Sequence, residues 1–214
     1  MTLKKKPGPA VWTAAEGAAL AKLETPAKIQ NWLNAIAYDP APGTASPRRV
    51  LGEGKANCFE GALFAGAALR FHGRPPLLVD MRSHNDDDHV LAVFKHNGAW
   101  GCVAKSNFTV LRFREPVYRT IRELMASYFD VFFNAIGEKT LRAYSVPFNL
   151  AKFDARNWMT TEEDISWIGD ELDLARHTRF MTPTQIRDLH LTDPTLVKAG
   201  LLGADPKGLF SPKR

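Results

Sequence analysis

Cys58 and His89 are the two residues whose type and position best fit nucleophilic chemistry. Cys58 is one of only two cysteines and stands near the start of the stretch NCFEGALFAGAALRFHG. Asn57 before it is a favourable N-cap, and Glu60 lies where a capping box needs a carboxylate, so the pattern predicts a helix that begins at Cys58. Because the N-terminus of a helix stabilises negative charge, we expect a lowered thiol pKa and a nucleophilic cysteine.

His89 is the expected proton carrier for this cysteine. It follows the acidic run of residues 86–88 and opens a predicted strand rich in Val, Leu and Phe. A histidine on a strand that faces a cysteine at a helix start can accept the thiol proton and later protonate the leaving group. The two residues therefore predict an acyl transfer that proceeds through a thioester on Cys58.

A third side chain is needed to hold the histidine ring, and two residues compete for that role. Asn97-Gly98 predicts a two-residue hairpin turn, and the simplest register then places Ser106 opposite His89. A bulge or a one-residue slip places Asn107 there instead. We favour Asn107, because an amide oxygen orients an imidazole N–H better than a hydroxyl does, and Ser106 stays open.

The elements that must position these residues follow from local patterns. Thr13 with Glu16 and Thr25 with Pro26 mark the starts of two amphipathic helices, the second of which we expect to pack on the core. A proline-rich loop, 39–47, precedes the cysteine helix. We then expect strands at 77–81, 89–95 and 99–107, a long helix at 115–137, a strand at 142–148, and helices from about 160, 183 and 194.

Two segments around these residues resemble a known family. The runs CFEGALFAGAALRFHGRPPLLVD and DHVLAVFKHNGAW resemble the transglutaminase-like core of the papain-like cysteine enzymes, over roughly residues 50–115. The resemblance implies an α+β fold, in which a cysteine-bearing helix packs on an antiparallel sheet, with Cys58 as nucleophile and His89 as base. The family usually has an aspartate four residues after the hairpin tryptophan, where this chain has Ala104, so the third role falls to Asn107 or Ser106.

Two alternative functions stay open. The segment NCFEGALF is similar to the region around the acceptor cysteine of arylamine N-acetyltransferases, although those enzymes usually carry arginine and glycine before the cysteine, where this chain has residues 55–57. A third possibility is a module that keeps the fold but binds a peptide or partner without catalysis, which the missing aspartate favours. Reactivity of the Cys58 thiol separates the enzymes from the module.

Composition limits the domain organisation and the partners. The chain of 214 residues fits one domain, 1–214, with a flexible tail at 1–10, the catalytic core at 50–115 and a helical remainder at 116–214. Five of the 28 basic residues lie in the termini, which leaves 23 against 23 acidic residues. A neutral body without a basic face argues against nucleic acid and membrane partners. The acyl transfer expected at Cys58 leads us to predict a peptide, protein or small amide substrate. The oligomeric state does not follow from the sequence.

We expect a cytoplasmic protein that needs no cofactor. The N-terminal segment lacks the apolar stretch of a signal peptide, and two cysteines are too few for a disulfide framework, so Cys58 and Cys102 are expected as thiols. Thioester chemistry requires no metal or organic cofactor. A metal site built from His84, Asp86, Asp88 and His89 is the weaker interpretation, because no regular spacing brings them together.

Overall fold

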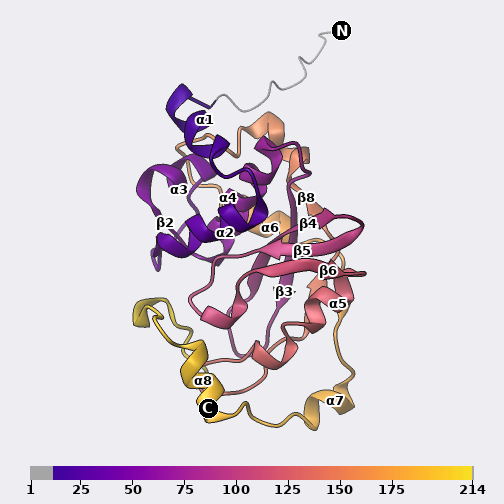
Figure 1. The fold of residues 1–214 in the computed structure, drawn as a ribbon. Coiled ribbons are helices and arrows are strands. Elements are labelled where there is room, and N and C mark those ends of the chain that lie inside the picture. The colour runs from indigo at the N-terminus through magenta and orange to yellow at the C-terminus, as the bar shows by residue number, and fades with distance from the viewer. Residues whose placement is uncertain (1–11, 214) are drawn as a thin grey trace.

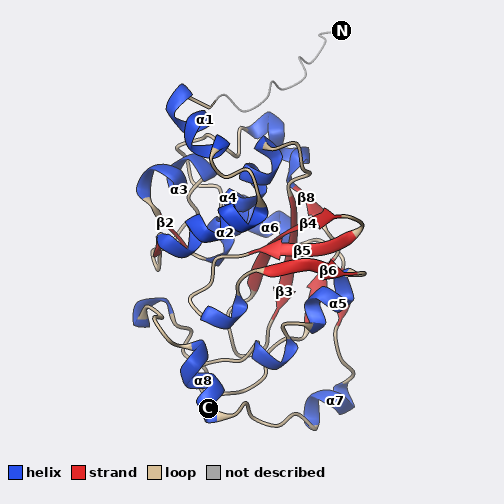
Figure 2. Cartoon of the chain, viewed as in Figure 1, coloured by secondary structure: helices blue, strands red, loops and turns tan. Residues whose placement is uncertain are grey.

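A seven-stranded antiparallel sheet forms the centre of the protein (Figure 1, Figure 2). The computed structural model describes residues 12–213. Neighbouring strands follow the order β6-β5-β4-β3-β7-β9, and β8 pairs with β3. The strands are β3 (Leu77–Arg82), β4 (His89–His96), β5 (Ala99–Val103), β6 (Arg114–Tyr118), β7 (Ala143–Ser145), β8 (Phe148–Asn149) and β9 (His177–Arg179). The protein is therefore an α+β protein with an antiparallel sheet, as the sequence predicts.

Four helices from the first third of the chain gather on one side of this sheet (Figure 2). They are α1 (Ala14–Ala21), α2 (Pro26–Ala35), α3 (Pro47–Glu53) and α4 (Cys58–Phe71). Helix α4 packs directly on β4, and the other three pack around α4. A short parallel pair, β1 (Ala37–Tyr38) and β2 (Lys55–Ala56), joins the chain segments that flank α3. The cysteine helix is thus the centre of the helical layer.

The second half of the chain alternates short helices with strands. Its helices are α5 (Ile121–Ala126), α6 (Trp167–Asp173), α7 (Pro183–Arg187) and α8 (Pro194–Gly200), and the 3-10 turns are η1 (Thr109–Leu111), η2 (Phe129–Val131), η3 (Leu150–Arg156) and η4 (Pro206–Gly208). No helix within residues 12–213 combines the length and the apolar character that crossing a bilayer requires.

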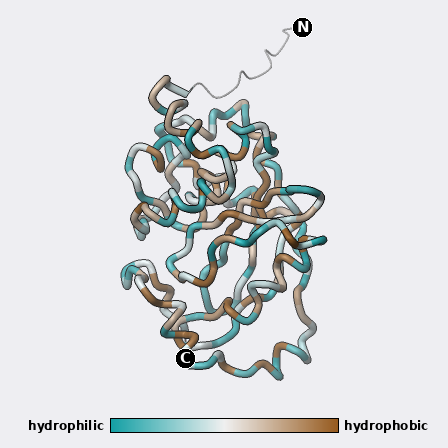
Figure 3. The backbone as a smooth tube through the Cα atoms, in the orientation of Figure 1, coloured by the Kyte–Doolittle hydropathy of each residue, from teal (hydrophilic) through white to brown (hydrophobic). Residues whose placement is uncertain are grey.

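Side-chain alternation along β4 creates two hydrophobic cores. Figure 3 colours the backbone by the hydropathy of each residue, and hydrophobic stretches recur in the middle of the molecule. Val90, Ala92 and Phe94 point into the core that holds α4, whereas Leu91 and Val93 point into a second core beside α5. Successive side chains of a strand face opposite sides of a sheet, so β4 is buried on both faces. This explains why residues 90–94 form a continuous apolar run rather than an alternating one.

Local sequence signals predicted several elements correctly. Thr13 forms the expected capping box at α1, and the hydroxyl of Thr25 accepts from the Lys28 N–H at α2. The turn after β4 pairs Lys95 with Trp100, as a two-residue loop requires. Helix α2 packs on α4 and β5, as predicted.

The predicted long helix at 115–137 is wrong, and the remainder at 116–214, predicted as helical apart from one strand at 142–148, contains more strands than that. Residues 114–118 form the edge strand β6 instead, where the missing N–H of Pro116 is tolerated. Thr120 then caps the N–H of Glu123 and starts the separate, short helix α5. The remainder also contributes β7, β8 and β9. Leu124, Met125, Tyr128 and Phe132 of this segment are buried in one hydrophobic core, whereas Val117 on the edge strand is 68% exposed.

Lys105 gives a direct test of how α2 is fixed. Its side chain is only 4% exposed, and its Nζ donates to the carbonyls of Leu33 (2.9 Å) and Ile36 (2.7 Å) at the end of α2. We expect Lys105→Met to lower the free energy of unfolding by about 2–3 kcal/mol, because both helix-end carbonyls lose their donor. Urea denaturation measures this loss. Lys22→Met, at an exposed site, is the matched control and should change stability by less than about 0.5 kcal/mol.

Candidate functional site

Cys58 occupies the first position of α4, and its surroundings hold that helix start in place. The Asn57 side chain accepts from the Glu60 N–H (3.0 Å), and the Glu60 carboxylate accepts from the Asn57 N–H (2.9 Å). The second oxygen of Glu60 accepts from the N–H of Ala45 (2.7 Å), so one buried carboxylate joins α4 to the preceding loop. The predicted capping box is confirmed.

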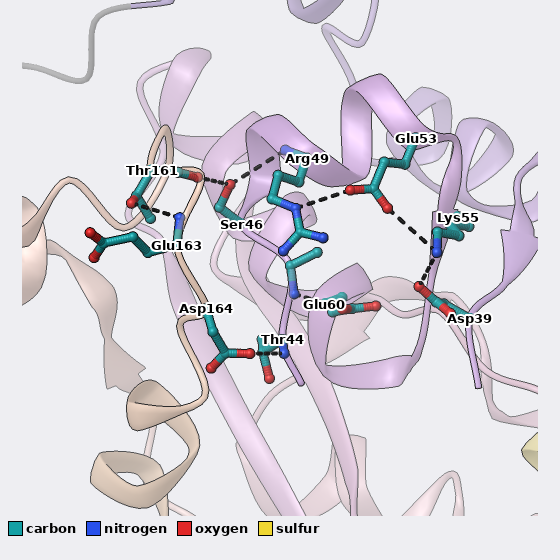
Figure 4. A network of polar contacts seen from close by, with 11 residues as sticks. Asp39, Thr44, Ser46, Arg49, Glu53, Lys55, Glu60, Thr161, Glu163 and Asp164 are labelled. Carbon is teal, nitrogen blue, oxygen red and sulfur yellow. Dashed lines mark hydrogen bonds and ion pairs between the residues drawn. The ribbon is translucent and has the colours of Figure 1, made fainter. Parts of the chain in front are cut away.

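The loop before α3 is itself held by further polar contacts (Figure 4). The Asp164 carboxylate accepts from the Thr44 N–H (2.7 Å), and the Ser46 hydroxyl donates to the carbonyl of Thr161 (2.6 Å). Segments far apart in sequence therefore fix the backbone that Glu60 bonds. The position of Cys58 depends on this network as well as on its own helix.

The Cys58 thiol is neutral in this structure. Burial raises its pKa to about 12, and the nearby charge of Asp87 adds to that rise. The amide groups of Val90, Phe59 and Cys58 itself favour the thiolate, but their effect is smaller. The Sγ donates to the carbonyl of Asp88 at 3.9 Å. The expectation of a lowered pKa is wrong here, because desolvation outweighs the helix terminus.

His89 opens β4 as predicted and is 4% exposed. Its Nε2 lies 2.9 Å from the carbonyl oxygen of Leu111 in η1. A carbonyl can only accept, so the proton sits on Nε2 and Nδ1 is the basic nitrogen of the neutral ring. The pKa of His89 is lowered to about 4. Burial is the main cause, the bond to the Leu111 carbonyl acts against it, and the charge of Arg114 adds a smaller lowering effect.

Cys58 and His89 line the same cavity, but no hydrogen bond joins these two described side chains. Strand alternation gives the reason. His89 and Leu91 are two residues apart in β4, so their side chains point to the same face of the strand. The His89 ring packs beside Phe132 in the second core, with ring centroids 6.3 Å apart. Cys58 approaches from the side of the sheet that α4 covers. The two side chains thus reach one cavity from different sides of β4, at its first residues.

Ser106 and Asn107 line the cavity too, but neither orients His89. The Ser106 hydroxyl accepts from the N–H of Phe108 (3.1 Å). The Asn107 amide bonds both main-chain groups of Asp205, accepting from its N–H and donating to its carbonyl, each at 2.8 Å. The predicted role for either side chain is therefore wrong in this structure.

The reason is the early end of β5. Its ladder with β4 stops at Val103, and Gln30 from α2 takes over the next residue by bonding both the N–H (2.9 Å) and the carbonyl (2.8 Å) of Ala104. The chain leaves the sheet before it reaches His89. The Leu111 carbonyl fills the orienting position instead, and sequence analysis missed it because a backbone oxygen carries no residue signature.

The cavity is small and mixed in character. Its volume is about 50 Å³, and apolar side chains such as Phe132 and Phe133 face the acidic residues 86–88 across it. Burial raises the pKa of Asp86 to about 6, and the Thr140 hydroxyl donates to its carboxylate at 2.9 Å. An open hollow of about 400 Å³, also lined by Cys58, lies alongside. Within residues 12–213, no three His, Cys, Asp or Glu side chains gather closely enough to hold a metal ion.

Comparison with known proteins adds no family to this geometry. No protein-family model matches the chain, and no curated protein matches its sequence.

The buried neutral imidazole predicts a pH dependence of stability. The folded protein binds fewer protons at His89 than the unfolded chain between pH 4 and about 6.5, so this residue makes the free energy of unfolding rise with pH across that window, by about 3 kcal/mol. Asp86, with its raised pKa, acts in the opposite direction. His89→Gln keeps an N–H for the Leu111 carbonyl but does not titrate.

We therefore expect the difference in stability between wild type and His89→Gln to grow as pH rises from 4 to 6.5, and to stay constant above it. Urea midpoints measured at half-unit steps of pH test this. A constant difference over the whole range would mean that His89 is solvated and titrates normally.

Proposed function

We propose that the protein catalyses cysteine-dependent acyl transfer, or amide or peptide bond hydrolysis, through a thioester on Cys58. The observation that carries this proposal is that Cys58, at the first turn of α4, and His89, at the first residue of β4, line one cavity. The order of a cysteine helix followed by an antiparallel histidine hairpin also supports the papain-like, transglutaminase-like core that the sequence resembles.

The chemistry follows from the groups present. Nδ1 of His89 takes the thiol proton while Sγ attacks the substrate carbonyl, and the leaving amine departs with that proton. Water or an amine then attacks the thioester and returns the proton, which regenerates the thiol. The N–H of Cys58 at the helix start is the proposed donor to the oxyanion. Both cysteines are free thiols, which suits the expected cytoplasmic setting.

The test is acyl trapping followed by a choice of acceptor. The protein is incubated with a p-nitrophenyl ester, and peptide mass spectrometry locates the acyl group, which we expect on Cys58 alone. Release by water, by hydroxylamine and by an arylamine is then compared, which separates a hydrolase from a transferase and from an arylamine N-acetyltransferase. Acyl groups on lysines or on Cys102 instead would refute the proposal.

A non-catalytic binding module is the second candidate. The observations that favour it are the missing hydrogen bond between Cys58 and His89 and the use of Asn107 to bind main chain rather than imidazole. A module predicts saturable peptide binding that Cys58→Ala leaves unchanged, with no acyl intermediate. Fluorescence anisotropy with a labelled peptide measures that binding.

A further inference from the structure

The segment that follows α8 crosses the candidate site and is held by two asparagine side chains. Asn107 bonds both main-chain groups of Asp205. Asn85 does the same for Lys213, donating to its carbonyl (2.9 Å) and accepting from its N–H (2.7 Å). Each amide thus satisfies one donor and one acceptor of a single residue, as a neighbouring strand would. These contacts recognise main chain and not side-chain identity.

Asn85 is itself positioned for this task. It adopts a positive φ of 55°, and its amide also donates to the carboxylate of Glu138 at 2.8 Å. Asn134 donates to the Asn85 carbonyl (3.1 Å) and to the same carboxylate (2.7 Å). A side chain held by this many partners is a preformed binding group rather than a loose surface residue.

Between the two asparagines, the segment closes the cavity. Gly208 lies against Tyr38 so closely that an added Cβ would stand 2.4 Å from the ring. Phe210 lines the cavity together with Cys58 and His89. The enclosed space of about 50 Å³ accommodates a few waters, whereas ligand pockets measure about 300–1,000 Å³. Cys58 is half-buried and also lines the open hollow alongside, so the segment covers its cavity side and limits the approach of a substrate from there.

The side chains of the segment match the walls they meet. Phe210 lines the cavity, as do the apolar side chains of Phe108, Phe132 and Phe133. Lys207 lines the neighbouring hollow together with the acidic residues 87–88. The aromatic residue thus shares its cavity with three other phenylalanines, and the cation three positions before it shares the neighbouring hollow with two carboxylates.

We infer that residues 205–213, which form the turn η4 and then continue without a helix or strand, occupy a channel that binds a polypeptide, so that this segment is an internal competitor of a peptide substrate or ligand. The inference rests on the proposed function for its link to acyl transfer. It names the substrate class as a peptide that carries a cation, a glycine in the next position and an aromatic residue two positions further on, as in Lys-Gly-Leu-Phe at 207–210, where the first two residues belong to the turn η4. Asn85 and Asn107 bind its main chain.

The experiment displaces the segment in the full chain. Gly208→Val forces side-chain atoms into Tyr38 and should expel the segment, whereas Ser211→Val adds similar bulk at an exposed position and is the matched control. Iodoacetamide should alkylate Cys58 at least about tenfold faster in Gly208→Val than in wild type, because removal of the segment exposes the cavity side of the thiol and increases its solvation. Ser211→Val should match wild type.

A peptide added separately tests the channel itself. A fluorescein-labelled peptide with the sequence of residues 204–213 should bind Gly208→Val, and bind wild type at least about tenfold more weakly, because the internal segment competes. Replacing phenylalanine by alanine in the peptide, or adding Asn107→Ala to Gly208→Val, should weaken binding by a similar factor. If Gly208→Val does not fold, Asn85→Ala in the full chain replaces it for alkylation, since it frees the Lys213 end.

These readouts separate the inference from the proposed function. Unchanged alkylation together with absent peptide binding overturns the channel, whatever the enzyme activity. Peptide binding and faster alkylation without any acyl intermediate on Cys58 keep the channel, overturn acyl transfer and favour the binding module.

Discussion

Cys58→Ala is expected to abolish turnover of an amide or ester reporter, with a loss of at least about 10³-fold in kcat/KM relative to wild type. His89→Ala should cost about 10²–10⁴-fold, because Nδ1 is the acceptor left free by the bond from Nε2 to Leu111. The thiol is neutral in the closed structure, so its proton must be removed during the reaction. Rates are measured at saturating and at low substrate to separate kcat from KM.

Cys102→Ala is the control for thiol chemistry elsewhere in the chain. Cys102 is buried in the second core, where its Sγ lies 2.9 Å from the Tyr128 hydroxyl. Burial raises its pKa to about 11, so this thiol is also neutral. We expect turnover to survive the substitution. Equal rates in wild type, Cys58→Ala and Cys102→Ala would contradict acyl transfer and leave the binding module as the better proposal.

The parts of the fold that the sequence predicted are those set by short-range chemistry. The cap at Asn57, the cap at Thr25 and the turn at Asn97-Gly98 each depend on a few adjacent residues, and all three occur as expected. Their hydrogen bonds span four residues or fewer, so no knowledge of the tertiary structure is needed. The start of the cysteine helix and the start of the histidine strand followed from these signals.

The wrong predictions arose where distant segments decide the local conformation. Glu115-Pro116 and the apolar residues that follow from Val117 suit the start of a helix, but pairing with β5 makes residues 114–118 a strand. Asn107 was expected to turn towards His89, and Asp205, almost a hundred residues further on, takes its amide. The pKa of Cys58 is raised rather than lowered for the same reason. The helix start is visible in the sequence, but the distant segments that bury the thiol are not. Long-range contacts therefore decide the chemistry of this site more than the elements do.

Glu60 both caps the start of α4 and binds the loop before α3. Its removal is expected to have the largest effect on stability. The side chain is 3% exposed, and its two oxygens accept from the N–H groups of Asn57 and Ala45. Glu60→Ala leaves both donors buried without a partner, which should lower the free energy of unfolding by about 3–5 kcal/mol. Urea denaturation at neutral pH measures the loss.

Glu60→Gln and Glu24→Ala make this prediction specific. The amide of glutamine keeps one oxygen for one of the two N–H groups and turns a donor towards the other, so its cost should lie between those of wild type and Glu60→Ala. Glu24 forms an exposed ion pair with Lys28 one turn away, and Glu24→Ala should cost less than about 0.5 kcal/mol. Because Glu60 also fixes the first turn of α4, acylation of Cys58 should slow in Glu60→Gln even where the protein is fully folded. A Glu60→Ala variant as stable as Glu24→Ala would show that the loop before α3 holds Cys58 without this carboxylate, and the network around Thr44 and Ser46 would then be the support to test.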